Sequence, residues 1–366
     1  MLESARLDPH GLIQSFGSRR VVLDEFQYAP ELIPAIKEAS DALSAQEKGK
    51  FILTGSADIF RSARTQEALP GHMARLELLP LSIREIRASR GNFLDQLISN
   101  DLDTDTPVAI NRERLAELII LGGYPEVQSK TPRARQMWFK SYTEGRLFKD
   151  FETLYAARGD YHSKIHALIA CLAGLSGNLL KYSSVGGLLE IDDRVVKRYI
   201  EVLELMFIVN RLPAWVRNRS KRLATVMPKV HFVDTGLACH LLGLRTPEEL
   251  QQSQYFGGLL ENLVMMDLIK QAGWAQEEVE IYHFRDKRKN EVDIVLERAD
   301  GSIFGIEVKA AATAKTQDFR GLAKLAEYAG DRLVNGYMFY SGSRALPFKV
   351  GERRFFAIPL SLLFGQ

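Results

Sequence analysis

Asp293, Glu307 and Lys309 are candidate reactive residues, and all three fall within residues 290–310, NEVDIVLERADGSIFGIEVKA. The stretch has the pattern of a β-hairpin, because Val292, Ile294 and Leu296 alternate with Glu291, Asp293 and Val295, and a second apolar run covers 303–308. An Asp-Gly pair, which is a strong hairpin signal, falls in the expected turn at 298–301. We therefore expect two adjacent strands that bring their polar side chains near one another.

The alternation of strand side chains predicts which residues share a face. Glu307 and Lys309 lie two residues apart and should point the same way. On the other strand, Asp293 stands between the apolar residues Val292 and Ile294 and should point away from their core face. If that direction is also the face of Glu307 and Lys309, the hairpin gathers two carboxylates and one lysine in a small cleft.

Such a group has the chemistry of a magnesium site. Mg²⁺ is usually held by one or two carboxylates together with water and substrate phosphate. Asp293 and Glu307 would be the metal ligands, and Lys309 could orient an attacking water or stabilise charge on a phosphate. The alternative is an ion pair on a solvated hairpin face, which is the usual origin of an isolated Glu-x-Lys.

The order of these residues resembles the PD-(D/E)XK nuclease superfamily. Its pattern is a carboxylate on a first helix, an Asp on the second strand and Glu-x-Lys on the third. Glu261, in the segment GGLLENLVMMDLIKQAG, matches the helix position. The resemblance implies a restriction-endonuclease-like α/β domain at 246–366, with Glu261, Asp293, Glu307 and Lys309 as catalytic residues.

Composition indicates a cytoplasmic protein of two or three globular domains. The chain has 366 residues, of which 46% are hydrophobic and 26% charged. It contains no apolar run of the roughly 20 residues that span a bilayer, and residues 1–20 lack the apolar centre of a signal peptide. Cys171 and Cys239 are far apart without metal-ligand spacing, so we expect both to be reduced.

Two short apolar runs near the N-terminus each end in polar residues. Residues 21–23 end in Asp24-Glu25, and residues 51–53 are followed by Thr54 and Ser56. This pattern is typical of buried parallel strands with chemistry at their C-terminal ends. A further strand is expected at 75–79. The acid pair has the form of a Walker B motif, although a capped strand-to-helix turn gives the same letters.

Several segments, in order, resemble a widespread prokaryotic family of AAA-type ATPases. They are VVLDEFQYAPEL, FILTGSADIF, LPGHMARLELLPLSIREI, LGGYPEV and KVHFVDTGLACHLLGL. Members of this family carry a C-terminal half long described as a domain of unknown function, with a winged helix and a nuclease-like fold. The resemblance implies that Asp24 holds Mg²⁺, that Glu25 activates water and that Thr54 and Ser56 form a polar sensor.

The chain departs from that family in two places. The phosphate-binding loop Gly-x-x-x-x-Gly-Lys-Ser/Thr does not occur in it, and Gly71-His72 stands where Gly-Arg is expected. We therefore expect residues 1–128 to be a partial AAA-type domain with a truncated P-loop ATPase-like parallel sheet and unpaired strand edges. A truncated gene product, a wrongly assigned start codon or a designed fragment would explain this. ATP would then be a cofactor only of a full-length form.

Residues 129–245 are expected to hold a helical linker at 134–150 and a winged helix-turn-helix at 177–234. A short helix at 183–190, opened by serine caps, precedes a turn at 191–193 and a second helix at 194–205. Arg194, Lys197 and Arg198 lie together on the face opposite the apolar stripe of this second helix.

A basic wing is expected to follow the helix pair. After a strand at 207–212, the segment 217–229 has no acidic residue and contains the basic residues Arg217, Arg219, Lys221, Arg222 and Lys229. A basic recognition helix beside a basic hairpin suits contact with phosphates, so DNA is the expected partner. The alternatives to DNA binding are that the basic surface is only solvated, or that the winged helix binds another protein.

Two functions fit these patterns. The first is a Mg²⁺-dependent DNA nuclease domain attached to a DNA-reading module. The second is a non-catalytic DNA-binding or regulatory relative of the ATPases, whose nuclease-like fold is only a scaffold. The family also admits partner subunits in a ring, and nothing in the sequence decides for or against them.

Overall fold

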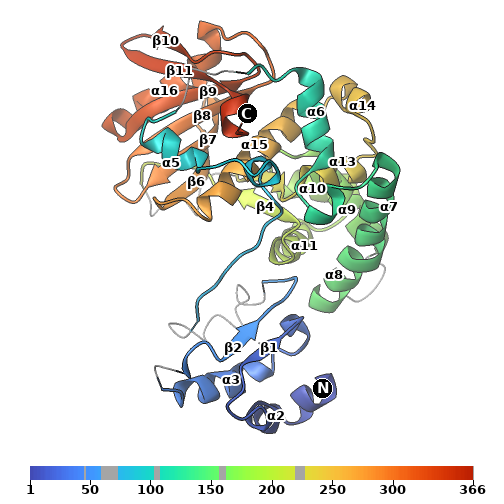
Figure 1. Ribbon diagram of the computed structural model, residues 1–366. Helices are drawn as coiled ribbons and strands as arrows, with labels where there is room; N and C mark the ends of the chain where they lie inside the picture. The colour runs from blue at the N-terminus through green and yellow to red at the C-terminus, as the bar shows by residue number, and fades with distance from the viewer. Residues whose placement is uncertain (45–46, 59–72, 103–107, 156–161, 219–226, 366) are drawn as a thin grey trace. The chain divides into compact units, whose positions relative to one another are not determined.

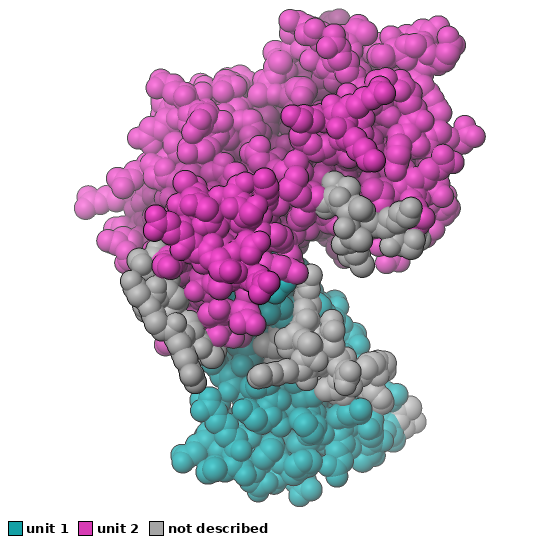
Figure 2. All heavy atoms as spheres, turned by 180° about the vertical axis from the view of Figure 1, so that it is seen from behind, with its two compact units in different colours: residues 1–78, 201–208 teal, residues 79–200, 209–366 magenta. Residues whose placement is uncertain are grey.

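The computed structural model describes residues 1–44, 47–58, 73–102, 108–155, 162–218 and 227–365. The chain forms two compact units, Met1–Leu78 with Glu201–Ile208, and Leu79–Ile200 with Val209–Gln366 (Figure 2). Residues 79–128, which the sequence groups with the N-terminal domain, pack within the second unit. Both units mix helices with strands, so the protein is of the α/β class.

The first unit contains a pair of parallel strands with helices beside them. β1 (Val21–Leu23) pairs in parallel with β2 (Phe51–Leu53), which confirms the two strands expected from the sequence. α1 (Leu2–Leu7), α2 (Pro9–Ser15) and α3 (Leu32–Asp41) supply apolar side chains to one core with them. The opposite face is uncovered, since Val22 is 62% and Ile52 56% exposed.

The strand expected at 75–79 is wrong. Residues 73–79 have no regular secondary structure, and Leu76 and Leu78 are more than nine-tenths exposed. A strand is stabilised when its apolar side chains are buried and its backbone pairs with a neighbour. No described residue covers these leucines, so an extended strand here would not be stabilised by their burial.

Helices dominate the first part of the second unit. α6 (Arg112–Leu121) packs on α13 (Thr235–Leu241) and α14 (Pro247–Gln252). The linker expected at 134–150 is present as α7 (Pro132–Tyr142), a π-helical turn at Thr143–Leu147 and α8 (Phe148–Tyr155) (Figure 1). No helix among the residues described here is long and apolar enough to cross a membrane.

A small antiparallel sheet and three helices follow. α9 (His162–Gly174) leads into β3 (Asn178–Leu179), α10 (Tyr182–Leu189) and α11 (Asp193–Leu205), and then into β4 (Val209–Leu212) and β5 (Lys229–Phe232). β5 is the central strand, in the order β3-β5-β4. The two expected helices and the strand after them are therefore present.

The expected serine cap of α10 is wrong. The helix begins at Tyr182 with Lys181 as its N-cap residue, and no side chain caps it. Ser183 and Ser184 lie two and three positions past the N-cap residue, inside the first turn, where their hydroxyl groups cannot occupy the N-cap position.

The C-terminal part is a six-stranded mixed sheet in the order β10-β11-β9-β8-β7-β6. Its strands are β6 (Val279–Arg285), β7 (Glu291–Arg298), β8 (Ile303–Lys309), β9 (Leu333–Tyr340), β10 (Leu346–Val350) and β11 (Arg353–Pro359). β7 and β8 form the expected antiparallel hairpin, and β9 joins β8 in parallel. α16 (Arg320–Ala329) packs on β7, β8 and β9, whereas α15 (Phe256–Ala272) contacts β8 and β5.

Short helices before α6 are fixed to this C-terminal part by buried polar bonds. In α4 (Ile83–Ile86), the Ile83 amide donates to Asp267 Oδ1 at 2.7 Å, and Arg84 donates to the Leu362 carbonyl at 2.8 Å. At the start of α5 (Phe93–Ile98), the Phe93 amide donates to Gln271 Oε1 at 2.9 Å. These bonds explain why residues 79–98 belong with the second unit.

Asn262 of α15 joins the helix to β5. Its Oδ1 accepts from the Phe232 amide at 2.6 Å, and its Nδ2 donates to the Phe232 carbonyl at 2.7 Å. Both residues are fully buried. One side chain therefore takes over the backbone pairing that a neighbouring strand would otherwise give to the end of β5.

We predict that Asn262→Leu destabilises the protein strongly. Leucine has a similar volume but leaves the amide and carbonyl of Phe232 buried and unpaired, at a cost of about 1–3 kcal/mol for each group. Urea denaturation measures the loss. Asn178→Leu is the matched control, because Asn178 is exposed and donates one bond of 3.2 Å to Ser176. Equal stability of the two variants would contradict the role given to Asn262.

Candidate functional site

The hairpin brings Asp293, Glu307 and Lys309 onto one face. Asp293 lies on β7 and its Oδ2 accepts from the amide of Val308 on β8 at 2.9 Å. Lys309 Nζ lies 3.5 Å from Glu307 Oε2. The charge of Asp293 also acts on both Glu307 and Lys309, so the three side chains form one electrostatic group. Their assignment as catalytic residues stays a prediction.

Glu261 reaches the same group from α15. The first turn of this helix passes so close to the loop before β3 that a Cβ on Gly258 would lie 2.3 Å from the Ser176 carbonyl oxygen. Across the contact, Gly177 has a φ of +76°, a conformation that glycine adopts without strain. These two glycines let α15 approach the small sheet, and Glu261 consequently faces both β5 and Asp293.

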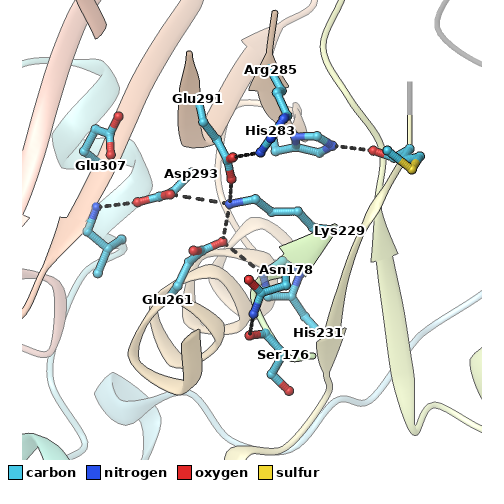
Figure 3. Close-up of polar contacts among 12 residues, drawn as sticks. Ser176, Asn178, Lys229, His231, Glu261, His283, Arg285, Glu291, Asp293 and Glu307 are labelled. Atoms are coloured by element: carbon cyan, nitrogen blue, oxygen red, sulfur yellow. Dashed lines mark hydrogen bonds and ion pairs between the residues drawn. The ribbon is translucent and has the colours of Figure 1, made fainter. Parts of the chain in front are cut away.

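At the centre of the carboxylates lies Lys229, the first residue of β5. Its side chain is 1% exposed, and its Nζ lies 2.7 Å from Glu261 Oε1, 2.6 Å from Glu291 Oε1 and 3.4 Å from Asp293 Oδ1 (Figure 3). The expectation that Lys229 belongs to a DNA-facing basic wing is therefore wrong. Because β5 is the central strand and α15 and β7 lie beside it, this lysine points into the protein.

Sequence reasoning also missed Glu291 and two histidines. Glu291 bridges Lys229 and Arg285 (Figure 3). His231 follows Lys229 by two residues on the same strand face, and its Nε2 lies 3.4 Å from Glu261 Oε1. His283 Nε2 lies 3.1 Å from the Met227 carbonyl oxygen. For Lys229, the only local signal is a charged residue opening the apolar run Lys229-Val-His-Phe-Val, because its carboxylate partners Glu261, Glu291 and Asp293 all lie more than 30 residues away.

Neither histidine contributes positive charge at neutral pH. Burial, together with the nearby Lys229 ammonium and His283, holds the pKa of His231 well below its usual value. Burial and Lys229 likewise lower the pKa of His283 to about 4. The carboxylates must therefore be balanced by lysine and arginine side chains.

If every carboxylate were ionised, one negative charge would be in excess. Four carboxylates, Glu261, Glu291, Asp293 and Glu307, face three cations, Lys229, Arg285 and Lys309. Burial, followed by the charge of Asp293, raises the pKa of Glu261 and of Glu307 well above the usual range. Burial alone would lower the pKa of Lys229, but the surrounding carboxylates, led by Glu261, raise it overall. Lys229 is thus charged, and the buried glutamates keep a proton to unusually high pH.

This arrangement suits an ammonium group and does not suit Mg²⁺. Magnesium requires near-octahedral oxygen ligands at about 2.0–2.1 Å. Here the Lys229 ammonium takes one oxygen from each of three carboxylates, and the second oxygen of Asp293 accepts from Val308. Within the described part of the chain, no three His, Cys, Asp or Glu side chains converge closely enough to hold a metal ion. The expected ligand pair, Asp293 and Glu307, stays a prediction.

In the first unit, the residues expected at a nucleotide site meet at the C-terminal ends of β1 and β2. The Thr54 hydroxyl donates to Asp24 Oδ1. Gln27 Nε2 donates to Glu25 Oε2 at 2.6 Å and to Ser56 Oγ at 2.9 Å. Gln27, which is 8% exposed, was missed by sequence reasoning and connects the acid pair to the next strand. The chemical roles of the four expected residues stay predictions.

The basic residues of α11 lie on its outer face. Arg194, Lys197 and Arg198 are exposed, whereas Val196 and Ile200 are buried. Among the expected wing residues, Arg217 is exposed and its carbonyl accepts from Arg332 at 3.1 Å. Three of the expected residues fall outside the part of the chain that the structure describes, namely Arg219, Lys221 and Arg222.

Comparison with known families divides the chain into three parts. Residues 3–87 match the AAA domain family, residues 112–248 match a domain of unknown function (DUF8612), and residues 256–363 match another (DUF4143). Together these matches support an AAA-like family whose members carry domains of unknown function. They agree with the coarse part of the resemblance drawn from the sequence.

Among curated proteins, two mycobacterial chains are similar to this one. They are Uncharacterized protein Mb2031c of Mycobacterium bovis and Uncharacterized protein Rv2008c of Mycobacterium tuberculosis, each 24% identical over 315 residues. The alignment covers 85% of this chain but 63% of either relative, so the chain spans less than two thirds of their length. No solved structure matches the chain.

We predict that the carboxylate cluster makes stability depend on pH. Because the folded pKa of Glu307 is raised above its ordinary 4.5, its contribution is complete below pH 4.5 and is lost as the pH rises through the folded pKa. The glutamine of Glu307→Gln cannot ionise. Between pH 5 and 8, the unfolding free energy of this variant should therefore fall less steeply with pH than that of the wild type. For one proton the two slopes differ by up to about 1.4 kcal/mol per pH unit.

Urea denaturation over this pH range measures the difference between the two slopes. Glu352→Gln, at an exposed position, is the control and should follow the wild type. If Glu307→Gln also follows the wild type at every pH, Glu307 is not the group that retains the proton.

Proposed function

We propose that this chain is a DNA-binding member of the AAA-like family, and that α11 is its DNA-contacting helix. The observation that carries the proposal is the exposed basic face that Arg194, Lys197 and Arg198 form on α11, the helix that follows α10 in a pair. The order α9, β3, α10, α11, β4, β5 supports an assignment as a winged helix-turn-helix, in which α11 would be the second helix of the pair.

The spacing of these residues supports contact with a phosphate backbone. Positions i, i+3 and i+4 are neighbours on a helix surface, so three side chains of like charge point outward together. The buried residues Val196 and Ile200 anchor the opposite side of the helix to its own unit. Phosphates of a polyanion would bind such a face by charge attraction.

Phosphodiester hydrolysis at the C-terminal hairpin is the competing function. Its support is that Glu261, Asp293, Glu307 and Lys309 lie together, in the order of a nuclease-like fold. Against it stands Lys229, whose ammonium takes the position that a metal ion would need. We therefore propose that the C-terminal domain is a non-catalytic platform for the DNA-binding part.

The acid pair of the first unit fits the metal-holding end of a nucleotide site. Asp24 would hold Mg²⁺ and Glu25 would face an attacking water, with Thr54 beside them. A bound nucleotide would bring its phosphates and Mg²⁺ to this edge. Because the described residues of the unit include no glycine-rich loop with a lysine to hold those phosphates, we assign no hydrolysis to it.

We predict that Lys197→Ala/Arg198→Ala weakens binding to duplex DNA about tenfold or more. The association constant K falls as salt concentration rises. Loss of two phosphate contacts should make the plot of log K against log salt concentration less steep by about 1.8, which is about 0.9 per contact. Fluorescence anisotropy of a labelled duplex at several salt concentrations measures both quantities.

Arg133→Ala/Lys140→Ala is the matched control for this double variant. It removes the same charge from exposed positions of another helix, α7, and should leave affinity and slope almost unchanged. Equal losses in the two double variants would mean that only net charge matters, and α11 would not be the DNA-contacting helix.

We predict that the wild-type chain does not nick supercoiled plasmid above background in Mg²⁺ or Mn²⁺. The reason is that Lys229 excludes a divalent ion from the carboxylates by charge and by position. Asp293→Ala should behave identically in the same assay. Wild-type nicking that is absent from Asp293→Ala would overturn the platform proposal and restore the nuclease, while leaving the DNA-binding proposal intact.

A further inference from the structure

We propose that a hollow on the surface of the second unit binds one nucleotide of a single-stranded nucleic acid, with its base stacked on Tyr328 and its phosphate held by Arg217 and Arg332. These residues line an open hollow with a volume of about 730 Å³. Sites for small ligands usually have roughly 300–1,000 Å³. The proposal goes beyond the duplex contact assigned to α11 and does not depend on it.

Two buried aromatic side chains hold the ring of Tyr328 at the hollow. The centroid of the Trp215 ring lies 5.9 Å from that of Tyr328, at an interplanar angle of 82°, and the centroid of Phe284 lies 5.5 Å away. Trp215 and Phe284 are 1% and 2% exposed, whereas Tyr328 is 44% exposed. A fixed aromatic ring with a free surface is the kind of platform on which the bases of single strands stack.

The backbone before Arg217 is also fixed. The Trp215 amide donates to the His283 carbonyl at 2.6 Å, and the His283 amide donates to the Pro213 carbonyl at 3.0 Å. These bonds attach residues 213–215 to the edge strand β6. Arg332 Nη1 in turn donates to the Arg217 carbonyl oxygen at 3.1 Å. The two arginine residues are therefore kept next to each other.

Neither guanidinium group is neutralised by a carboxylate. Among the described residues, no Asp or Glu forms an ion pair with Arg217 or Arg332. Asp300 also lines the hollow, but its Oδ2 lies 3.3 Å from Arg298 Nη1, and its Oδ1 accepts from the Ser302 amide at 2.8 Å. The hollow thus keeps an excess of positive charge, and guanidinium groups bind phosphate through paired N–H donors.

A nucleotide would use both parts of this surface, whereas an acidic peptide would use only one. A carboxylate side chain can pair with the arginines but has no planar ring to cover Tyr328. A nucleotide joins a flat base to a phosphate, and stacking accepts any base because each base has a π-face. The combination of an exposed aromatic ring and two arginines therefore favours a nucleotide.

The test measures binding of the full chain to a fluorescently labelled oligothymidylate by anisotropy, and to a labelled abasic strand of the same length. Both strands carry the same number of phosphates, so a preference for oligothymidylate reports contact with bases. We expect the wild type to bind oligothymidylate about tenfold more tightly than the abasic strand. Tyr328→Leu should lose this preference because leucine cannot stack, and Tyr328→Phe should keep it.

Trp274→Leu is the matched control for the ring. Trp274 is 45% exposed in the same unit and lies outside the hollow, so this variant should keep the wild-type preference. Lys197→Ala/Arg198→Ala should also keep the preference, whatever its effect on duplex binding. Failure of the α11 proposal would therefore be distinguishable from failure of this one.

Arg217→Ala/Arg332→Ala tests the phosphate contact. It should weaken binding of both strands and make the plot of log K against log salt concentration less steep by about 0.7, the value for one phosphate of a single strand. Arg344→Ala/Arg354→Ala is the matched control, because it removes the same charge from two exposed positions of the same unit. It should change neither quantity.

Unlabelled competitors identify the source of the nucleotide. Whichever of oligothymidylate and oligouridylate displaces the label at the lower concentration shows whether the strand is DNA or RNA, and either result supports the nucleotide site. Equally effective displacement by oligoglutamate would overturn it, because the hollow would then bind acidic peptides through charge alone.

Three further results would overturn the proposal. They are equal affinity of the wild type for the two labelled strands, a preference for oligothymidylate that survives in Tyr328→Leu, and an unchanged affinity of Arg217→Ala/Arg332→Ala. Thermal denaturation establishes that each variant is folded. If Tyr328→Leu does not fold, the exposed arginine pair decides: the expected loss of affinity and salt dependence supports the site, and no loss overturns it.

Discussion

Lys229 carries a positive charge into a part of the protein where four carboxylates come together, and much of the second unit is arranged around that charge. Without it, Glu261, Glu291 and Asp293 would repel one another across the contact between α15 and β7. Removing one partner from a buried ion pair typically costs about 3–5 kcal/mol, because the remaining charges have lost their water. The close approach of these elements therefore depends on a single side chain of β5.

Elements with a strong local pattern were predictable from the sequence. The hairpin of β7 and β8 followed from alternation and an Asp-Gly turn, and β1 and β2 followed from short apolar runs ending in polar residues. The helix pair α10 and α11 was placed to within a residue or two, although its cap was misassigned. In each case, the information lay within about twenty residues of chain.

The part of the site that was missed depends on contacts between distant residues. Lys229 follows a basic segment, so its neighbours in sequence suggest a solvent-facing wing. What makes it buried is its place on a central strand, with Glu261 and Glu291 brought from elsewhere in the chain. The failed strand at 75–79 is the converse case, because a good strand pattern has no neighbour among the described residues to pair with.

Adjacent residues of α15 hold β5 by different means. Glu261 binds the charge at the start of the strand, and Asn262 pairs with the backbone at its end. These bonds join the segment matched at 112–248 to the segment matched at 256–363. The boundary between the two matched families is thus not a boundary between independent folding units. Either half expressed alone would leave Lys229 without its carboxylates or the carboxylates without Lys229, so the two matched segments should fold only together.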